Sequence, residues 1–496
     1  DEHAQIDQAL AEALDFLRLA ASLAVAPIPP KLVVQVFARL DGLDDPRALA
    51  RARLALLQTE RASLSQKKDE GNALVHALVS RVVRFRDPHL HRREQILMIA
   101  LEVLRSTLVA AADIRAHTEL APYVVHARQL VGGELGDPVM ASVAGWIARF
   151  DYERGNYIES ESLARRRLAA CTAWWGELHA ETLLAKGDLA RALQAQGRTQ
   201  QARVLAEEVA EGRGNLLGAE HPDTLTALNN LAGILHATGE LRRAAETHLR
   251  VLEIRRRILG PDHEHTLFSV NNLGTALAAL GDHQEARGCL EEVLESRTRL
   301  LGASHPDTLS SRASLGQLLF EMGDKDAALH ELRETYRLRV QTLKETHPST
   351  AFTAASLARA LIATGHLEEA ETLLRPALHH CRDALGGSHP TCCLLANNLG
   401  KSLAKQARPA EARPLYEEAL EGQTQIAGAR DQFTMKFAAN LTETLLALGD
   451  NERANLIFEQ YLRWLVAESP PADQRPEREL LEQAITLQKA IQQPQS

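Results

Sequence analysis

Apolar residues recur at helical spacing along most of this chain, and the pattern itself repeats every 42 residues. In the unit 221–262, apolar positions three or four residues apart define one face of a helix. They are Leu225, Leu228, Leu231, Ala232 and Leu235. Gly239 follows, the residue type that most readily takes the left-handed conformation that ends a helix. A second apolar stripe then runs over 241–259, so each unit is predicted to be a pair of helices.

Several residue types keep the 42-residue step without a slip. The histidines in this register are His179, His221, His263, His305, His347 and His389. One pair of helices cannot cover its own apolar face, so neighbouring pairs must stack. We therefore predict an all-α fold with stacked helix pairs over 137–472, the first and last of them degenerate. A Pro-rich break at 469–476 precedes a polar capping helix within 473–496.

The segment HPDTLTALNNLAGILHATGELRRAAETHLRVLEIRRRILG (221–260) resembles the 42-residue tetratricopeptide repeat of kinesin light chains. Those repeats share the Asn-Asn-Leu-Ala core and the Leu-Gly that ends the second helix. The resemblance covers 137–472 and implies a right-handed superhelix, an α-solenoid that binds a protein or peptide. It does not specify the ligand.

Residues 1–136 have a different pattern. We expect a winged-helix-like domain over 1–90, with a short β-hairpin around 62–73, and a helical bridge over 91–136. This part resembles the winged-helix region of signal-transduction ATPases with numerous domains (the STAND or NB-ARC class), through Val-His-Ala-Leu-Val at 75–79 and Leu-Ala-Pro-Tyr at 120–123. That resemblance implies that His76 is a sensor of the β-phosphate of bound ADP. The family's Met-His-Asp form is absent, and the alternative is a helix-start histidine packed beside Leu78.

A ligand is expected on the face formed by the first helices of the repeats. The asparagines that precede core leucines there are Asn230, Asn272, Asn398 and Asn440. An Asn amide can both donate and accept, which suits a peptide bond. Further along the same face Arg359, Lys401 and Lys405 predict an electropositive section for acidic residues. The alternative is that each asparagine ties adjacent first helices together.

The six periodic histidines are not expected to bind metal. Equivalent residues of neighbouring repeats are two helix-packing distances apart, each roughly 8–10 Å, whereas zinc needs nitrogens about 2 Å away. Local bonding at helix starts is the interpretation we favour. One denser cluster contains His379, His380, Cys381, His389, Cys392 and Cys393. It lacks a Cys-x-x-Cys pair, and Cys392 and Cys393 occupy slots for small buried residues, so we favour core packing over a metal site.

Gly-Lys-Ser at 400–402 resembles the end of a phosphate-binding loop, but Leu395 stands where the first glycine is needed. We therefore predict no catalytic residues, no enzyme activity and no cofactor in this chain, with ADP or ATP bound only if an ATPase domain lies upstream. The net charge of −9 argues against nucleic acid as a partner. We interpret the basic run at 81–93 as a solvated or interdomain surface.

The five cysteines lack the spacing of a disulfide framework, the first ten residues are not a signal peptide, and no run of 18 residues is apolar throughout. We expect a cytoplasmic protein with no membrane span. Because the chain begins with Asp1, we also expect it to be part of something longer. Our first hypothesis is the sensor and scaffold region of a STAND-type signalling ATPase. The alternatives are a freestanding adaptor of the kinesin-light-chain type and a winged-helix transcriptional regulator with a repeat sensor.

Overall fold

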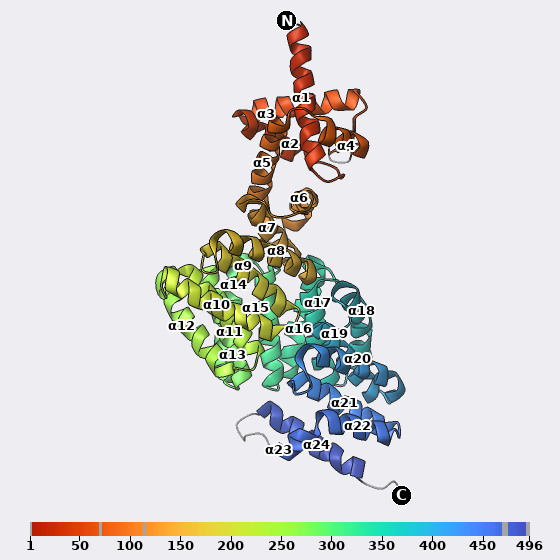
Figure 1. Ribbon diagram of the computed structural model, residues 1–496. Coiled ribbons are helices and arrows are strands. Elements are labelled where there is room, and N and C mark those ends of the chain that lie inside the picture. The colour runs from red at the N-terminus through yellow and green to blue at the C-terminus, as the bar shows by residue number, and fades with distance from the viewer. Residues whose placement is uncertain (1, 69–71, 113–115, 469–474, 493–496) are drawn as a thin grey trace. The chain divides into compact units, whose positions relative to one another are not determined.

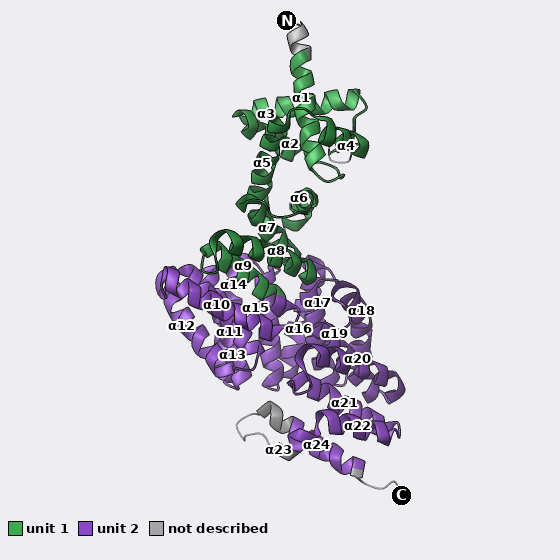
Figure 2. Ribbon diagram, viewed as in Figure 1, with its two compact units in different colours: residues 1–192 green, residues 193–496 purple. Residues whose placement is uncertain are grey.

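The computed structural model describes residues 2–68, 72–112, 116–468 and 475–492 (Figure 1). The chain packs as two compact units, 1–192 and 193–496 (Figure 2). Within the described residues the fold is almost wholly helical, as predicted, and the only strands there form one two-stranded sheet.

The first unit begins with helices, continues through a β-hairpin and returns to helices. Its elements are α1 (Glu2–Ser22), α2 (Pro30–Asp41), α3 (Asp45–Arg61), β1 (Ser65–Lys67), β2 (Ala73–Val75), α4 (Ala77–Arg86), α5 (Leu90–Thr107), η2 (Leu108–Ala112), α6 (His117–Leu130), α7 (Pro138–Glu153), α8 (Tyr157–Trp175) and most of α9 (Ala180–Ala195), whose residues from 193 on belong to the second unit. β1 and β2 are antiparallel with Ser65 opposite Val75, and Ile28, which lies between α1 and α2, forms a bridge to Ala73. The expected hairpin is therefore present, displaced slightly toward the C-terminus.

From the sequence we expected no apolar run long enough to span a membrane, and the helix that follows α4 differs from this expectation. By length and composition Leu90–Ala112 could span one, since an 18-residue window has a mean hydropathy of 1.6. The same helix has a core face: Ile96, Leu101 and Leu104 are fully buried, and α5 packs on α1, α2 and α7. A helix that supplies the core of a folded unit passes the same test of composition, so this one is weak evidence for a membrane span.

The second unit consists of helix pairs in sequence. They are α10 (Thr199–Leu217), α11 (Pro222–Ala237), α12 (Leu241–Leu259), α13 (Glu264–Leu280), α14 (His283–Leu301), α15 (Pro306–Glu321), α16 (Lys325–Leu343), α17 (Pro348–Ala363), α18 (Leu367–Leu385), α19 (Pro390–Lys405), α20 (Pro409–Ala427), α21 (Gln432–Ala447), α22 (Asn451–Tyr461), α23 (Arg463–Glu468) and α24 (Arg475–Gln492). α12 has the bounds that the apolar pattern indicated. The Pro-rich break lies largely outside the described residues. The expected capping helix is α24, which buries Leu480, Ala484 and Leu487 and packs on α21.

The periodic histidines begin the first helices, as the sequence indicated. In each case Nδ1 accepts a hydrogen bond from the backbone N–H two residues on, for example from Asp223 to His221 at 3.2 Å and from Thr391 to His389 at 3.1 Å. The same bond is made by His179, His263, His305 and His347. A side-chain acceptor at this position satisfies a donor that the helix itself leaves unpaired.

A second periodic residue joins each repeat to the next. Arg255, Arg297 and Arg339 are buried near the ends of α12, α14 and α16. Each donates to the carbonyl oxygen ten residues ahead and to the hydroxyl fourteen residues ahead, both on the first helix of the following repeat. We call this arrangement the arginine joint. It supplies directional bonds where stacking alone would be apolar.

Candidate functional site

The first helices of successive repeats pack directly on one another from α11 to α21, in addition to packing on their own second helices. Contacts between successive second helices are fewer. The stack therefore curves toward the first helices. We call the surface formed by the solvent-facing residues of α11, α13, α15, α17, α19 and α21 the first-helix face, and this is the predicted ligand surface.

The asparagine column of this face has two environments. Asn398 is only 6 % exposed, and its Nδ2 donates to the carbonyl oxygen of Ala355 on α17 at 3.0 Å. Asn440 donates in the same way to Oδ1 of Asn397 on α19 at 2.9 Å. Asn398 and Asn440 therefore connect adjacent first helices, which was our alternative interpretation of the asparagines. Asn230 is exposed and Asn272 half-buried, so a ligand could reach the column at its N-terminal end.

The predicted electropositive section is brought together. Arg359 on α17 and Lys401 and Lys405 on α19 are all exposed. Partial burial of the amino group lowers the pKa of Lys401. The positive charges of Lys405 and Arg359 lower this pKa further, whereas the negative charge of Glu443 raises it. The lowered pKa of Lys401 therefore reflects mainly the removal of its ammonium group from water, and repulsion by the two neighbouring cations adds to it.

Acidic and aromatic groups border this section, and sequence reasoning overlooked one of the acids. Glu321, on α15, has a carboxylate oxygen 3.8 Å from Arg359, and burial raises the pKa of Glu321. The Arg359 guanidinium also lies 4.7 Å from the centre of the Phe320 ring. Glu321 could have been found from the sequence, because it occupies the same position of the 42-residue register as Lys405.

Two exposed phenylalanines on this face were also missed. Phe268 on α13 and Phe352 on α17 are 44 % and 43 % exposed and stand two repeats apart in register. Exposed aromatic side chains beside charged groups are typical contact residues for a protein or peptide. The face therefore offers polar, cationic and apolar contacts in separate places.

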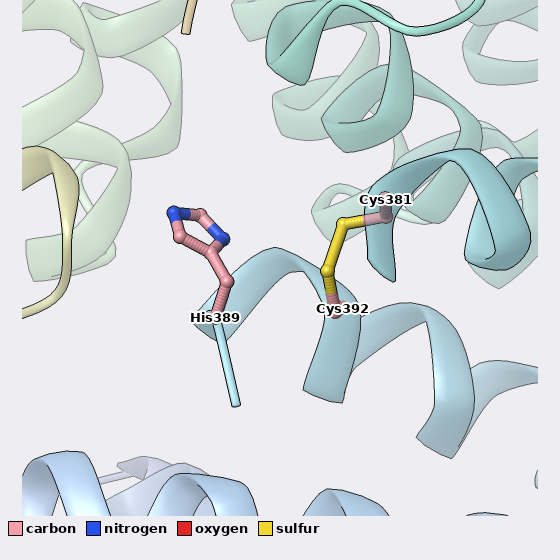
Figure 3. Close-up of side chains that lie close together, drawn as sticks. All are labelled: Cys381, His389 and Cys392. Carbon is pink, nitrogen blue, oxygen red and sulfur yellow. A yellow bond between two sulfur atoms is a disulfide. The ribbon is translucent and has the colours of Figure 1, made fainter. Parts of the chain in front are cut away.

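The His/Cys cluster differs from our expectation. Cys381, at the end of α18, is disulfide-bonded to Cys392 on α19, with a Cα–Cα distance of 5.6 Å (Figure 3). The inference from cysteine spacing that no disulfide forms was wrong, because stacking of consecutive repeats brings together residues that linear spacing does not associate. Cys393 is in the core, as expected, and burial raises its thiol pKa to about 12. Cys381, His389 and Cys392 are close enough to be considered as metal ligands.

His76 begins α4, and its Nδ1 accepts a hydrogen bond from the backbone N–H of Leu78 at 3.2 Å. The helix-start interpretation is confirmed, but the expected packing beside Leu78 is not, because the Leu78 side chain is exposed. His76 itself is exposed to solvent. Its role as a nucleotide sensor stays a prediction.

The other two sequence features are explained by local structure. The basic run at 81–93 is partly neutralised within its own unit, since Arg92 donates to Asp15 and Arg84 to the carbonyl oxygen of Ala21. The Gly-Lys-Ser segment at 400–402 lies inside α19, as expected, so it does not form a phosphate-binding loop.

Two family models, both described as tetratricopeptide repeat, match the chain. One matches residues 223–297, 266–341 and 390–463, and the other 182–223 and 350–391. Together they span more than half of the sequence. The chain belongs to the tetratricopeptide repeat family, whose members are typically scaffolds for binding other proteins.

Among solved structures the chain is similar to a Podosopora anserina putative kinesin light chain with nearly identical TPR-like repeats. That match has 28 % identity, covers 42 % of this chain and 99 % of the other, and has a TM-score of 0.34. A STAND protein with a tetratricopeptide repeat sensor from Pyrococcus horikoshii matches with 14 % identity over 83 % of this chain and 63 % of that one, TM-score 0.43. A Rap protein complexed with competence and sporulation factor matches with 12 % identity over 85 % and 99 %, TM-score 0.45. No curated protein matches the chain significantly.

Proposed function

We propose that this chain is the protein- or peptide-binding sensor and scaffold region of a STAND-type signalling ATPase, and that it recognises acidic residues of its partner on the first-helix face. The observation that carries the binding site is the gathering of three exposed cations on neighbouring first helices, Arg359 on α17 and Lys401 and Lys405 on α19, whose mutual repulsion contributes to the lowered pKa of Lys401. Cations held close together on neighbouring helices repel one another, and this repulsion is relieved when a carboxylate binds between them.

The first unit supports the signalling part of this proposal. Its order is a helix, the bridging residue Ile28, α2, α3 and then the hairpin β1–β2, with Ile28 paired to Ala73. One bridging residue and a two-stranded hairpin interleaved with three helices in this order support the proposal of a winged helix. In the proposed protein this domain relays ligand binding to an ATPase module that precedes Asp1. A ligand would activate that module only by binding the active arrangement more tightly than the resting one.

In this proposal the chain works in the cytoplasm, has no catalytic residues of its own, and holds no cofactor. ADP or ATP would be bound by the upstream module, with His76 as its sensor. The corresponding test is the coding sequence upstream of Asp1. A Gly-x-x-x-x-Gly-Lys-Thr/Ser motif is expected there; a coiled coil in its place would favour the adaptor of kinesin-light-chain type.

The binding site is tested with a fluorescein-labelled peptide of alternating Asp and Glu and a matched peptide of Asn and Gln, measured by fluorescence anisotropy. We expect the acidic peptide to bind more tightly, with an affinity that falls as salt is added. Arg359→Gln with Lys401→Gln should weaken binding by about tenfold or more, because two charge-assisted bonds are removed.

The matched control is Arg333→Gln with Arg382→Gln. These arginines lie on second helices, are similarly exposed, and pair with Glu369 and Glu418. The control changes the net charge by the same amount and should leave binding nearly unchanged. Equal weakening by both double variants would show that net charge, not the first-helix face, attracts the peptide.

A further inference from the structure

One joint between repeats is built differently from the three arginine joints that precede it. The arginine joint is repeated at 255, 297 and 339, but the next member of the register is Cys381. Cys381 takes the place of the arginine near the end of α18, next to the start of α19. At this joint the directional hydrogen bonds of the arginine are therefore replaced by a sulfur atom.

Two further positions of the same joint change with it. Cys392 stands in the register of Thr224, Thr266, Thr308 and Thr350. The buried hydroxyls of those threonines have no hydrogen-bond partner among the described residues, so cysteine can replace threonine there without loss of a bond. Leu395 replaces the hydroxyl residue that accepts from the arginine elsewhere, which is Ser311 in the joint of Arg297. The acceptor has disappeared together with the donor, and a pair of cysteines has taken their place.

We propose that Cys381 and Cys392 form a reversible cross-link that holds α19 against α18, and that thiol–disulfide exchange at this joint regulates acidic-ligand binding on the first-helix face. The second part rests on the proposed function. The exchange partner is a low-molecular-weight disulfide of the glutathione type. Its two-electron reduction to two thiols accompanies oxidation of Cys381 and Cys392, whose two protons pass to the departing thiolates.

The position of the joint connects it to the electropositive section. Lys401 and Lys405 are on α19, the helix that the disulfide anchors, and Arg359 is on α17, which packs on both α18 and α19. In the reduced joint neither the disulfide nor an arginine holds α19 at its N-terminal end. The spacing of Lys401 from Arg359 then depends on apolar packing, on the amide tie of Asn398, and on the bond that Ser402 donates to the carbonyl oxygen of Leu367 on α18. Reduction is therefore expected to loosen the site.

A metal ion bound by Cys381, Cys392 and His389 is the alternative use of the same atoms. His389 argues against it, because both ring nitrogens already have partners. Nδ1 accepts the N–H of Thr391, as in the other repeats, and Nε2 lies 2.9 Å from the carbonyl oxygen of Ala195. A metal bound by His389 would displace one of these two bonds, either the helix-start bond that every other periodic histidine makes or the bond to Ala195. The presence of His389 near the cysteines therefore follows from its helix-start position in the repeat and does not indicate a metal site.

Both sulfur-bearing residues are buried, at 2 % and 1 % exposure, so exchange requires local opening of the joint. The adjacent thiol of Cys393 does not compete as the attacking group, because its raised pKa keeps it protonated near neutral pH. Exchange should consequently be slow but confined to one pair. The thiols of Cys171, Cys289 and Cys393 serve as internal references, since they are free in the oxidised chain.

The experiment compares the chain equilibrated with oxidised and with reduced glutathione. Thiols titrated after denaturation should number three in the first case and five in the second, as the free cysteines and the pair require. Hydrogen exchange of the first turns of α19 should be faster by about tenfold or more after reduction. The acidic peptide should also bind the reduced form several-fold more weakly.

Two variants make the result specific. Cys381→Ser with Cys392→Ser should exchange like the reduced chain under both conditions. Cys381→Arg with Cys392→Thr and Leu395→Ser restores the composition of the joint around Arg297, and this variant should be protected and indifferent to glutathione. If the serine variant fails to fold, this restored joint still supplies the comparison.

Equal protection of α19 in the oxidised and reduced wild type would overturn the cross-link. Stoichiometric binding of Zn²⁺ by the reduced chain, with protection retained, would replace it by the metal joint. A redox effect on hydrogen exchange without any peptide binding would leave the cross-link standing and refute the proposed acidic-ligand site. Peptide affinity that is equal in both redox states would refute the regulation alone.

Discussion

The arginine joint permits a quantitative prediction for Arg339→Met. Arg339 is 5 % exposed and donates to the carbonyl oxygen of Ser349 at 2.8 Å, to Oγ1 of Thr353 at 2.6 Å and to Oγ of Ser310 at 3.1 Å. Bonds from a charged donor contribute about 1.5–3 kcal/mol each. Against them stands the cost of burial, which lowers the pKa of Arg339 from 12.5 to about 10 and corresponds to roughly 3 kcal/mol. The three bonds outweigh this cost, so the variant should lose about 1.5–6 kcal/mol of local stability.

Native-state hydrogen exchange of the amides in α16 and α17 is the suitable assay, because a repeat stack need not unfold in two states. Arg337→Met is the control on the same helix, with a side chain 55 % exposed and paired to Glu334; it should change stability by no more than about 0.5 kcal/mol. A double-mutant cycle of Arg339→Met with Thr353→Val should reveal a coupling energy of about 1 kcal/mol or more. A neutral or stabilising effect of Arg339→Met would mean that desolvation dominates, and the reasoning would fail.

Two other substitutions test separate features of the second unit. His248 is hydrogen-bonded to Asn229, and burial lowers the pKa of His248 to about 4. The unfolded chain takes up this proton near pH 6.5, whereas the folded chain takes it up only near pH 4. The free energy of unfolding should therefore fall by about 2 kcal/mol between pH 7 and pH 5. In His248→Gln, thermal melts at the two pH values should differ by correspondingly less, and an unchanged acid sensitivity would exclude His248 as its source. A Cβ at Gly274 would lie 2.9 Å from Cγ of Leu290, whereas one at Gly233 meets nothing within 4 Å. Gly274→Ala should therefore lower the melting temperature through a clash costing about 1–3 kcal/mol. Gly233→Ala should raise the melting temperature, because alanine is favoured over glycine in a helix by up to about 1 kcal/mol. If both variants shift the melting temperature in the same direction, this explanation of the packing is wrong.

The fold was largely predictable because every repeat contains the same local sequence signals. His221 with Pro222 starts a helix, Gly239 ends it, and the apolar stripe selects the buried face. Each of these signals acts within one or two helical turns, so its effect can be deduced without knowing any distant contact. Repetition then supplies the tertiary structure, since every unit meets a copy of itself.

The candidate site was predictable only in part, because its properties depend on contacts between repeats. The sequence indicated that Arg359 and Lys401 share a face, yet it did not show that Glu321 lies beside Arg359 or that Asn398 is buried against Ala355. Whether a polar side chain on a first helix faces solvent or its neighbour depends on how closely the helices approach. That distance varies along the stack and has no periodic signature.

Differences among the joints also bear on how the stack responds to a ligand. Within the described part of the chain Arg213 makes one bond, to the carbonyl oxygen of Asp223, whereas Arg255 and Arg339 each make two bonds across their joints and a third to a hydroxyl group of their own repeat. The register continues after Cys381 with Gln423, which donates to Asp431 at 3.0 Å. In a solenoid each repeat contacts mainly its neighbours, so the weakest joint determines where one cooperative segment ends and the next begins. Once the disulfide is reduced, the start of α19 lacks the arginine bonds of the joints before it, and the bond from Ser402 to the carbonyl oxygen of Leu367 remains only further along the helix. The boundary then falls between Arg359 and Lys401, and binding of an acidic segment across both would restore the continuity that the cross-link provides.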